Sequence, residues 1–349
     1  MQKIRSKIFY SPTDISNFEK CSYITVNDIR NLTTPLEIKE TTETLQEFIN
    51  QGLEIEKKYI QSLKDQGAQL FDGSKVKKED RLNKTLEAMK EGYEYIYHPL
   101  FEYQQWVGEP DLLIKVDKTS EIGSFSYIPA DIKRAKEPKQ ENLTQILTYC
   151  FLLEKIQGVL ADHFLIINGP ENDKHEFAVT DYYDAYEQLR QKFEKYVLSH
   201  SLTTPDPCKA CQFCQYLPTC DSIWSDTHIK NVTGITNRQI KKLKGIAHTV
   251  EQLAHLEQTS VEGIGDQTLM KLKSQAILQQ EKIETGIPKY IFKKIPEGKG
   301  FHRLPEACDH DIFFDIEGDP TVDGGHEYLF GYIFNNSFHS LWASNIEEE

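Results

Sequence analysis

The sequence predicts an α/β domain in which helices flank a mixed sheet and which ends near Trp224. Residues 40–67 repeat apolar side chains at helical spacing, residues 161–169 form an apolar run of strand length, and residues 181–200 form a further amphipathic pattern. Strands and helices that alternate in this way are typical of a sheet covered by helices. We therefore expect residues 1–225 to fold as one unit.

The elements expected in this unit follow from the same patterns. The segment 11–24 begins with polar cap residues and predicts a short helix that carries Cys21. The tyrosine-rich segment 92–108 alternates as strands do, and its rings either pack in the sheet or stack on bases. We expect helices at residues 40–67, 76–92, 142–155 and 181–200, and strands at residues 108–116, 126–138 and 161–169.

One carboxylate interrupts the apolar face of the first long helix. Glu56 shares a stripe with Ile49, Leu53, Ile60 and Leu63, at spacings of four, three, four and three. Burial of a lone carboxylate is costly, so Glu56 is expected to be protonated, paired or bound to a metal. A lysine on a neighbouring element and a metal ion would both satisfy it.

Two strands on either side of the polar turn 117–124 carry acidic residues and a lysine. Asp111 begins the first strand, and Asp131 and Lys133 lie two apart on the second, so both point to one face. Two converging carboxylates suit a hard divalent cation such as Mg²⁺ or Mn²⁺, and a lysine can orient or deprotonate a water molecule. The pattern predicts phosphodiester hydrolysis; the alternative is an ordinary ion pair in a half-buried sheet.

The helix that follows presents an amide and a phenol on one face. Gln145 and Tyr149 lie four residues apart among apolar neighbours, where they could hold a nucleic-acid strand against the site. Together with the two strands, this ordered set of residues resembles the RecB-like branch of the PD-(D/E)xK nucleases. The resemblance implies a restriction-endonuclease-like fold, a mixed sheet flanked by helices, and a metal-dependent (deoxyribo)nuclease activity.

The resemblance also implies a part for each residue. Glu56, Asp111 and Asp131 would hold Mg²⁺ or Mn²⁺, and Lys133 would position the attacking water. In this family the helix that offers the glutamate often has a histidine just before it, where this sequence has Ile55. The departure leaves Glu56 as the ligand on this helix and leaves the usual part of the histidine unassigned.

Composition limits the class of protein. The 349 residues contain no apolar run long enough to cross a membrane, and the basic start MQKIRSKIFY lacks the apolar centre of a signal peptide. We therefore expect a cytoplasmic protein without a membrane partner. The net charge of −14 argues against nucleic acid. Basic residues are nevertheless grouped into solvated faces or phosphate tracks: Lys75, Lys77, Lys78 and Arg81; Lys133, Arg134, Lys136 and Lys139; Lys241, Lys242 and Lys244.

The seven cysteines are expected to be ligands or thiols rather than disulfides. Cys208, Cys211, Cys214 and Cys220 are close enough in sequence to hold a zinc ion by themselves. The alternative joins Cys21 to the last three and leaves Cys208 over; this arrangement resembles the iron-sulfur nucleases of the RecB-like and AddB types and implies a [4Fe-4S] cluster. We favour the cluster, which would tie the ends of the domain together. Two cysteines are expected to be core thiols: Cys150 and Cys308.

The segment after the first domain is rich in short helices. We expect residues 226–282 to form a small helical region, in which the segment 261–265 resembles the hairpin of helix-hairpin-helix modules. The resemblance implies that Gly263 and Gly265 let backbone amides meet a phosphate at a helix N-terminus. A helical linker or protein-docking module is the alternative.

The last part of the sequence suggests the start of a second enzyme domain. Residues 283–309, rich in Pro, Gly and Lys, predict a linker. Residues 310–349 begin with an apolar strand that carries Asp315 and Glu317 on one face, which resembles the first motif of RNase H-like, DEDD-type exonucleases and implies a metal-binding pair. Since the chain stops at Glu349, we expect this domain to be truncated.

These observations together predict a metal-dependent nuclease that hydrolyses DNA. The resemblance implies a single-stranded DNA exonuclease in DNA repair or recombination, with a helicase as a possible companion in the same polypeptide or complex. The competing hypothesis is a catalytically inactive scaffold, with a zinc ribbon, that only binds nucleic acid or a protein partner.

Overall fold

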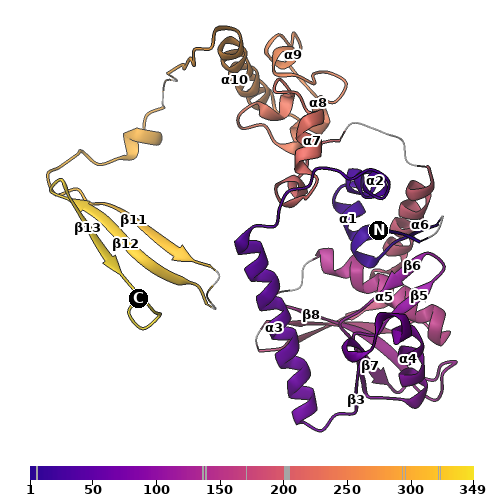
Figure 1. Ribbon diagram of the computed structural model, residues 1–349. Coiled ribbons are helices and arrows are strands. Elements are labelled where there is room, and N and C mark those ends of the chain that lie inside the picture. The colour runs from indigo at the N-terminus through magenta and orange to yellow at the C-terminus, as the bar shows by residue number, and fades with distance from the viewer. Residues whose placement is uncertain are drawn as a thin grey trace.

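The computed structural model describes residues 1–4, 7–135, 137, 140–169, 171–199, 205–292, 294, 296–320, 322 and 324–349, and Lys136 and Lys139 of the second basic group lie outside this set. Its central feature is a six-stranded sheet (Figure 1). The strands, in spatial order, are β10 (Asp173–Ala178), β9 (His163–Asn168), β8 (Ser126–Lys133), β7 (Leu112–Val116), β4 (Tyr95–Tyr97) and β3 (Leu70–Asp72).

The sheet mixes parallel and antiparallel neighbours. β8 is parallel to β9 and β3 is parallel to β4, whereas β7 is antiparallel to both β8 and β4. The α/β class and the mixed sheet flanked by helices are therefore confirmed. β8 is buried along its length up to Lys133, because it has a strand on each edge and helices over both faces.

Helices cover both faces of the sheet. On one face, Ile60 of α3 packs in a cluster with Ala130 and Ile132 of β8. On the other face, α1, α5 and α6 pack in a cluster with Leu113 and Tyr127 (Figure 1). Since successive residues of a strand point to opposite faces, Asp131 is directed away from α3. The helices are α1 (Pro12–Lys20), α2 (Ser22–Asn31), α3 (Glu43–Asp65), α4 (Lys78–Glu91), α5 (Gln140–Gln157) and α6 (Tyr183–Ser199).

The first half of α3 differs from the prediction. Ile49 and Leu53, which were expected on a buried stripe, are 46% and 47% exposed, whereas Ile60 and Leu63 are buried. Helical spacing indicates which side chains share a face, but that face is buried only where the helix lies over another element. α3 reaches the sheet from about Ile55 onward, and its beginning extends past it (Figure 1).

Short elements complete the first domain and precede its end. A small hairpin, β1 and β2, lies at the N-terminus, and Tyr10 then bridges to Trp106 of a second hairpin, β5 and β6. The bounds are β1 (Gln2–Ile4), β2 (Lys7–Phe9), β5 (Phe101–Tyr103) and β6 (Trp106–Gly108), with the 3-10 helices η1 (Gly73–Lys75), η2 (Val179–Asp181) and η3 (Lys209–Phe213) and the helix α7 (Leu217–Ile223).

The helical region that follows has a hydrophobic core of its own. Residues from Ile229 to Ala276 form this core, with η4 (Ile229–Asn231), α8 (Asn237–Leu243), α9 (Val250–Ala254) and α10 (Asp266–Thr285). α10 ends three residues beyond the expected boundary at residue 282. Gly286 ends the helix with φ of +73°, a left-handed conformation that interrupts helical hydrogen bonding and that glycine adopts without strain.

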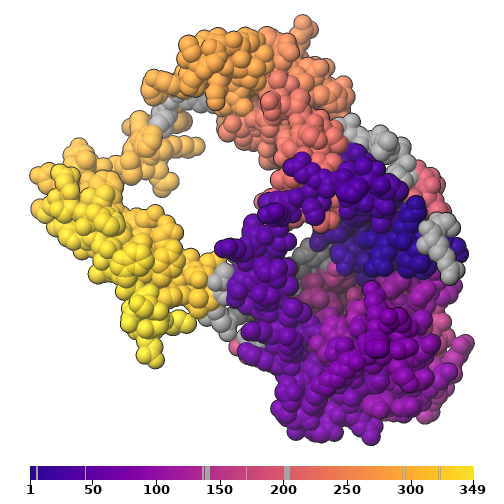
Figure 2. Space-filling view, viewed as in Figure 1, coloured from indigo at the N-terminus to yellow at the C-terminus, as the bar shows by residue number. Residues whose placement is uncertain are grey.

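The end of the chain forms a three-stranded antiparallel sheet that lies apart from the other elements (Figures 1 and 2). Its strands are largely exposed on both faces, with Phe313, Phe338 and Trp342 between 66% and 68% exposed. Cys308 lies just before this sheet and is exposed, so the prediction that it is a core thiol is wrong. Cys150 is buried, as predicted. The elements are η5 (Gly300–Arg303), β11 (Phe313–Asp319), β12 (His326–Phe334) and β13 (Ser337–Trp342).

Among the described residues, no helix is both long enough and apolar enough to cross a membrane.

Candidate functional site

Asp111, directly before β7, meets Asp131 and Lys133 of β8 as the sequence predicted. Leu112 is paired with Ala130, so the register continued by one residue sets Asp111 opposite Asp131. Lys133 Nζ lies 2.8 Å from Asp131 Oδ2 and 3.6 Å from Asp111 Oδ2. The alternation of β8 and its pairing with β7 thus bring the three side chains together on the face away from α3.

The charges of this cluster act strongly on one another. The Asp111 side chain is 19% exposed and accepts a hydrogen bond of 2.7 Å from the Ile132 amide. Burial, and then the charge of Asp131, raise the pKa of Asp111 to about 8. Burial alone would lower the pKa of Lys133, but the charges of Asp131 and Asp111 raise it above its usual range. Lys133 is therefore a cation at neutral pH and acts as a hydrogen-bond donor.

Glu56 is buried, and its partner is a histidine that the sequence did not point to. His98 Nε2 lies 2.8 Å from Glu56 Oε1, and His98 Nδ1 lies 3.5 Å from Glu109 Oε1. Arg81 of α4 forms an ion pair with Glu109. A chain of alternating charges thus runs from Arg81 through Glu109 and His98 to Glu56.

Pairing accounts for how Glu56 and His98 are charged. Burial lowers the pKa of His98, but the hydrogen bonds to Glu109 and Glu56 outweigh this and raise it to about 9. Burial raises the pKa of Glu56, but hydrogen bonds from His98 and Tyr97 outweigh this and lower it. Both groups are therefore charged at neutral pH, as expected for an ion pair that replaces lost hydration.

His98 was missed because no spacing in the sequence marks it. It follows β4 directly, and its backbone N–H donates to the carbonyl oxygen of Asp111 at 3.0 Å. The pairing of β4 with β7 therefore sets this histidine beside Asp111. Glu109 carried a weak signal, since it lies two residues before Asp111, whereas Arg81 had appeared only within a basic group.

The carboxylates face cations of the chain itself, and no group of three or more His, Cys, Asp or Glu in the described part of the chain is arranged to hold a metal ion. Glu56 is nevertheless near enough that its charge raises the pKa of both Asp111 and Lys133. Glu56 Oε1 and Asp131 Oδ2 are buried, and each lies 2.8 Å from a cation of the chain, His98 and Lys133 respectively. Carboxylate oxygens are the donors that Mg²⁺ and Mn²⁺ prefer, so these side chains suit such an ion by their chemistry, while in this structure they are paired with His98 and Lys133.

Tyr149 on α5 borders the same cluster. Its hydroxyl donates to the carbonyl oxygen of Glu109 at 3.1 Å. Burial, followed by the charges of Asp131, Asp111 and Glu109, raises the pKa of Tyr149 well above its usual value. The phenol is therefore a neutral donor beside the carboxylates, and Gln145 lies one helical turn before it and is half-buried.

A glycine permits this close approach of helix and strand. A Cβ on Gly108 of β6 would lie 2.6 Å from Leu152 Cδ1 and 3.2 Å from the Tyr149 ring. A side chain at this position would push α5 away from the residues that precede Asp111. The position thus requires glycine for space rather than for a left-handed backbone.

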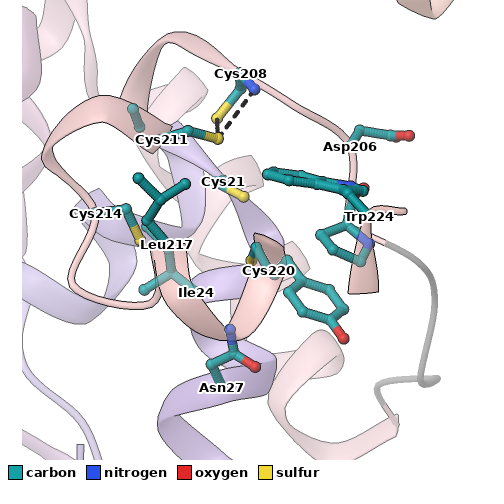
Figure 3. Close-up of a pocket in the computed structure, with 13 residues that line it drawn as sticks. Cys21, Ile24, Asn27, Asp206, Cys208, Cys211, Cys214, Leu217, Cys220 and Trp224 are labelled. Carbon is teal, nitrogen blue, oxygen red and sulfur yellow. Dashed lines mark hydrogen bonds between the residues drawn. The ribbon is translucent and has the colours of Figure 1, made fainter. Parts of the chain in front are cut away.

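Five cysteines line a single pocket between the start and the end of the first domain (Figure 3). The cavity among them measures about 10 Å³, which is room for about one water molecule. Cys21 lies between α1 and α2, and the other four are carried by η3, α7 and the residues beside them. The five are Cys21, Cys208, Cys211, Cys214 and Cys220.

Cys208 contacts two of these thiols, although the favoured ligand set had left it out (Figure 3). Its Sγ lies 3.8 Å from Cys211 Sγ. Hydrogen bonds first from Cys21 and then from Cys211 lower the pKa of Cys208, and the same contact with Cys208 raises the pKa of Cys21 and Cys211. The structure therefore does not set Cys208 apart, and the choice of four ligands stays a prediction.

Hydrogen bonds tie the two ends of the domain around these cysteines. Tyr216 Oη donates to Asp28 Oδ1 at 2.7 Å, and the amide of Lys39 donates to the carbonyl oxygen of Gln215 at 2.7 Å. Residues 32–42 lead directly into α3, which carries Glu56. The cysteine-rich segment therefore braces the connection that enters the helix of the acidic site.

The other predicted site residues lie outside this cluster. Gly263 has φ of +78°, and a Cβ there would lie 2.9 Å from Lys242 Cε, while Gly265 precedes the first residue of α10. Asp315 and Glu317 are exposed on β11, opposite Gly331 and Leu329 of β12. These four residues belong to the helical region and to the separate sheet, so they form no common site with the acidic cluster (Figure 1).

Comparisons with known proteins add little. No protein-family model matches the chain, and no curated protein matches it. Among solved structures, the crystal structure of SSO0001 is similar over 64% of this chain and 90% of that chain, with 13% sequence identity and a TM-score of 0.29. A likeness of this degree supports no conclusion about function, which therefore rests on the side chains themselves.

Proposed function

We propose that the protein is a metal-dependent nuclease of the RecB-like PD-(D/E)xK family, with a restriction-endonuclease-like fold in residues 1–225. One observation carries the proposal: Lys133 lies within 3.6 Å of both Asp111 and Asp131, in a buried cluster that Tyr149 borders. Removing two carboxylates and an amine from water lowers the stability of the fold. Charged groups that are kept in such a place are often catalytic or ligand-binding residues.

The residues divide the work of phosphodiester hydrolysis. Glu56, Asp111 and Asp131 would hold Mg²⁺ or Mn²⁺, which when bound neutralises phosphate charge and acidifies water. Because Lys133 stays protonated, it donates a hydrogen bond to the phosphate or orients the attacking water rather than removing its proton. Gln145 and Tyr149 are the neutral polar side chains that would hold the nucleic-acid strand.

His98 fixes the side chain of Glu56 in the ion-free protein. Its two nitrogens contact Glu56 and Glu109, and Arg81 fixes Glu109 in turn. A carboxylate held in one rotamer loses less entropy when it binds a cation. We therefore assign His98 a positioning role.

Four of the five cysteines would hold a [4Fe-4S] cluster or Zn²⁺, and we favour the cluster on Cys21, Cys211, Cys214 and Cys220, with Cys208 as the alternative ligand. Their site joins the first two helices to the end of the domain, so either group would stabilise the connection into α3. The proposed setting is DNA repair or recombination in the cytoplasm, on single-stranded DNA, with a helicase as a possible companion.

A scaffold that binds nucleic acid without cutting it is the second candidate. The observation that favours it is the pairing of each carboxylate with a cation of the chain, which leaves the cluster neutralised without a metal ion. On this alternative the cysteines would hold zinc and the protein would be colourless, whereas an iron-sulfur protein is brown.

The deciding experiment incubates the protein with end-labelled single- and double-stranded DNA and Mg²⁺ or Mn²⁺. We expect cleavage that is lost in the Lys133→Ala variant, while its affinity for the same DNA is retained. Lys118→Ala is the matched control, because Lys118 is also ion-paired, to Asp162 at 2.6 Å, but lies outside the cluster. Cleavage that survives Lys133→Ala, or no metal-dependent cleavage in the unmodified protein, would refute the proposal.

A further inference from the structure

A second cavity opens beside the acidic cluster. It measures about 310 Å³ and lies between the N-terminal hairpin, the start of α1, β6, the start of α4 and α5. Tyr149 and Glu109 line it, and the same two residues border the cluster around Asp111. The cavity and the acidic cluster therefore share a wall.

The lining of this cavity has an apolar side and a polar side. Phe9, Leu100 and Val107 contribute apolar surface, and Ser11, Thr13 and Lys78 contribute hydroxyl groups and a cation. Two carboxylates also line the cavity, and each is paired with a cation: Asp14 with the Met1 amine and Glu109 with Arg81. Phe9 is half-buried, so part of its ring is open to an occupant. A small ligand that is flat and apolar at one end and anionic at the other matches such a lining.

The walls of the cavity are held rigidly. The amide of Tyr10 donates to the carbonyl oxygen of Gln105, and the amide of Val107 donates to the carbonyl oxygen of Tyr10, both at 2.9 Å. The Tyr10 ring packs edge-on against Trp106 with ring centroids 4.5 Å apart. Phe9 is thereby attached to a fixed backbone and not to a free terminus, as a preformed binding site requires.

The charge at the mouth favours a phosphate. Lys78 is exposed at the first turn of α4 and is near enough to Glu109 to contribute to the lowering of its pKa, for which hydrogen bonding to His98 is the main cause. Lys77, also exposed, precedes it. Lys78 is therefore the member of the first basic group that lies at the edge of the acidic cluster, where its charge attracts a phosphate.

We propose that this cavity binds the nucleotide next to the scissile phosphate of a single-stranded nucleic acid, with its base against Phe9 and its phosphate at Lys78. The proposal rests on the proposed function for the identity of the neighbouring site. A single strand is required, because a paired base would not be free to enter a cavity bounded by five elements. The volume lies at the lower end of the range for small-ligand sites, about 300–1,000 Å³, which suits one nucleotide.

The test measures binding separately from cutting. Fluorescence anisotropy with a labelled oligodeoxynucleotide, in buffer without divalent cations, compares the intact strand with a series in which one abasic residue is moved along the strand. Phe9→Leu removes the ring and keeps apolar bulk, and Phe292→Leu, at a residue 89% exposed outside the cavity, is its control. Lys78→Gln tests the phosphate contact, and Lys174→Gln, on the edge strand β10, is its control; both lysines are exposed, so neither change threatens folding.

We expect Phe9→Leu to weaken binding of the intact strand about 5-fold or more, with no change for Phe292→Leu. At one position the abasic residue should weaken binding to the unmodified protein by a similar factor and should cause no further loss in Phe9→Leu, because both changes remove one contact. Lys78→Gln should weaken all strands alike and reduce the dependence on salt concentration.

Three results would each overturn the assignment of the cavity. They are losses of affinity that add at every abasic position, an unchanged affinity in both Phe9→Leu and Lys78→Gln, and no binding of any strand. Because this measurement needs no catalysis, it separates the two proposals. Coupled penalties in a protein that cuts nothing would support the cavity and refute the nuclease, whereas metal-dependent cleavage with additive penalties would refute the cavity alone.

Discussion

Replacement of His98 by asparagine tests the charged chain that holds Glu56. His98 has φ of +47°, and asparagine tolerates this left-handed conformation better than most residues, so His98→Asn removes the charge with little backbone strain. In the unmodified protein the imidazolium contacts Glu56 and Glu109. In the variant neither carboxylate has this cation as a partner.

The expected effect depends on pH in a defined direction. The pKa of His98 is raised from its ordinary value of 6.5 to about 9, so the folded state binds a proton more tightly than the unfolded state. The stability that this provides is fully present below about pH 6.5 and is lost as the pH rises to about 9. At about 1.4 kcal/mol per tenfold difference, the contribution is about 3 kcal/mol, an upper limit because the side chain is partly solvated.

The assay is urea unfolding of metal-free protein between pH 6 and pH 10. We expect the free energy of unfolding of the unmodified protein to fall relative to His98→Asn by about 3 kcal/mol across this interval. His163→Asn is the control, because His163 on β9 lies 3.9 Å from Glu176 of the edge strand β10, outside the cluster. Parallel pH profiles for the unmodified protein and His98→Asn would refute the pairing of His98 with the two carboxylates.

Three further predictions test the surroundings of the site. Gly73→Ala should destabilise the fold by about 1–3 kcal/mol in thermal unfolding, because the added Cβ would lie 2.5 Å from the carbonyl oxygen of His98. Gly52→Ala should stabilise the fold by about 0.5–1 kcal/mol, because Gly52 lies inside α3 and its added Cβ would have no atom within 4 Å. Equal effects of the two changes would contradict this. Burial and the charge of Asp131 raise the pKa of Asp111 to about 8, so ionisation of Asp111 lowers the stability of the fold as the pH rises from about 4 through 8. Asp111→Asn should therefore raise the melting temperature of metal-free protein more at pH 9 than at pH 5. An equal rise at both pH values would contradict this. Cys21→Ser should lower the bound iron or zinc measured by elemental analysis and lower the melting temperature, while Cys308→Ser, at an exposed cysteine, should change neither; retained metal in Cys21→Ser would remove it from the ligand set.

The acidic cluster shows how far short-range sequence patterns reach. Asp131 and Lys133 could be set on one face from their spacing alone, because a strand has a period of two residues. Their meeting with Asp111 needed only one antiparallel pairing across a short turn, and the structure confirms it. Local geometry is dictated by the backbone, so these relations are visible in the sequence.

The partner of Glu56 could not be found in the same way. The stripe on α3 indicated that Glu56 needed a partner, for which a metal ion or a lysine was expected, and a histidine 42 residues away forms an ion pair with it. Likewise, the stripe indicated burial for Ile49 and Leu53, yet they are exposed because α3 extends past the sheet. A helical period fixes which residues share a face, and only packing decides what that face meets.

The sequence by itself determined the α/β class, the order of helices and strands, and the set of acidic, lysine and cysteine side chains available for chemistry. Only the tertiary structure decided that His98 and Glu109 join the acidic cluster, that Cys208 lies among the other thiols, and that a cavity adjoins Tyr149. The physical reason is that periodicity and pairing act over a few residues, whereas ion pairs and cavities depend on segments that the fold brings together from distant parts of the chain.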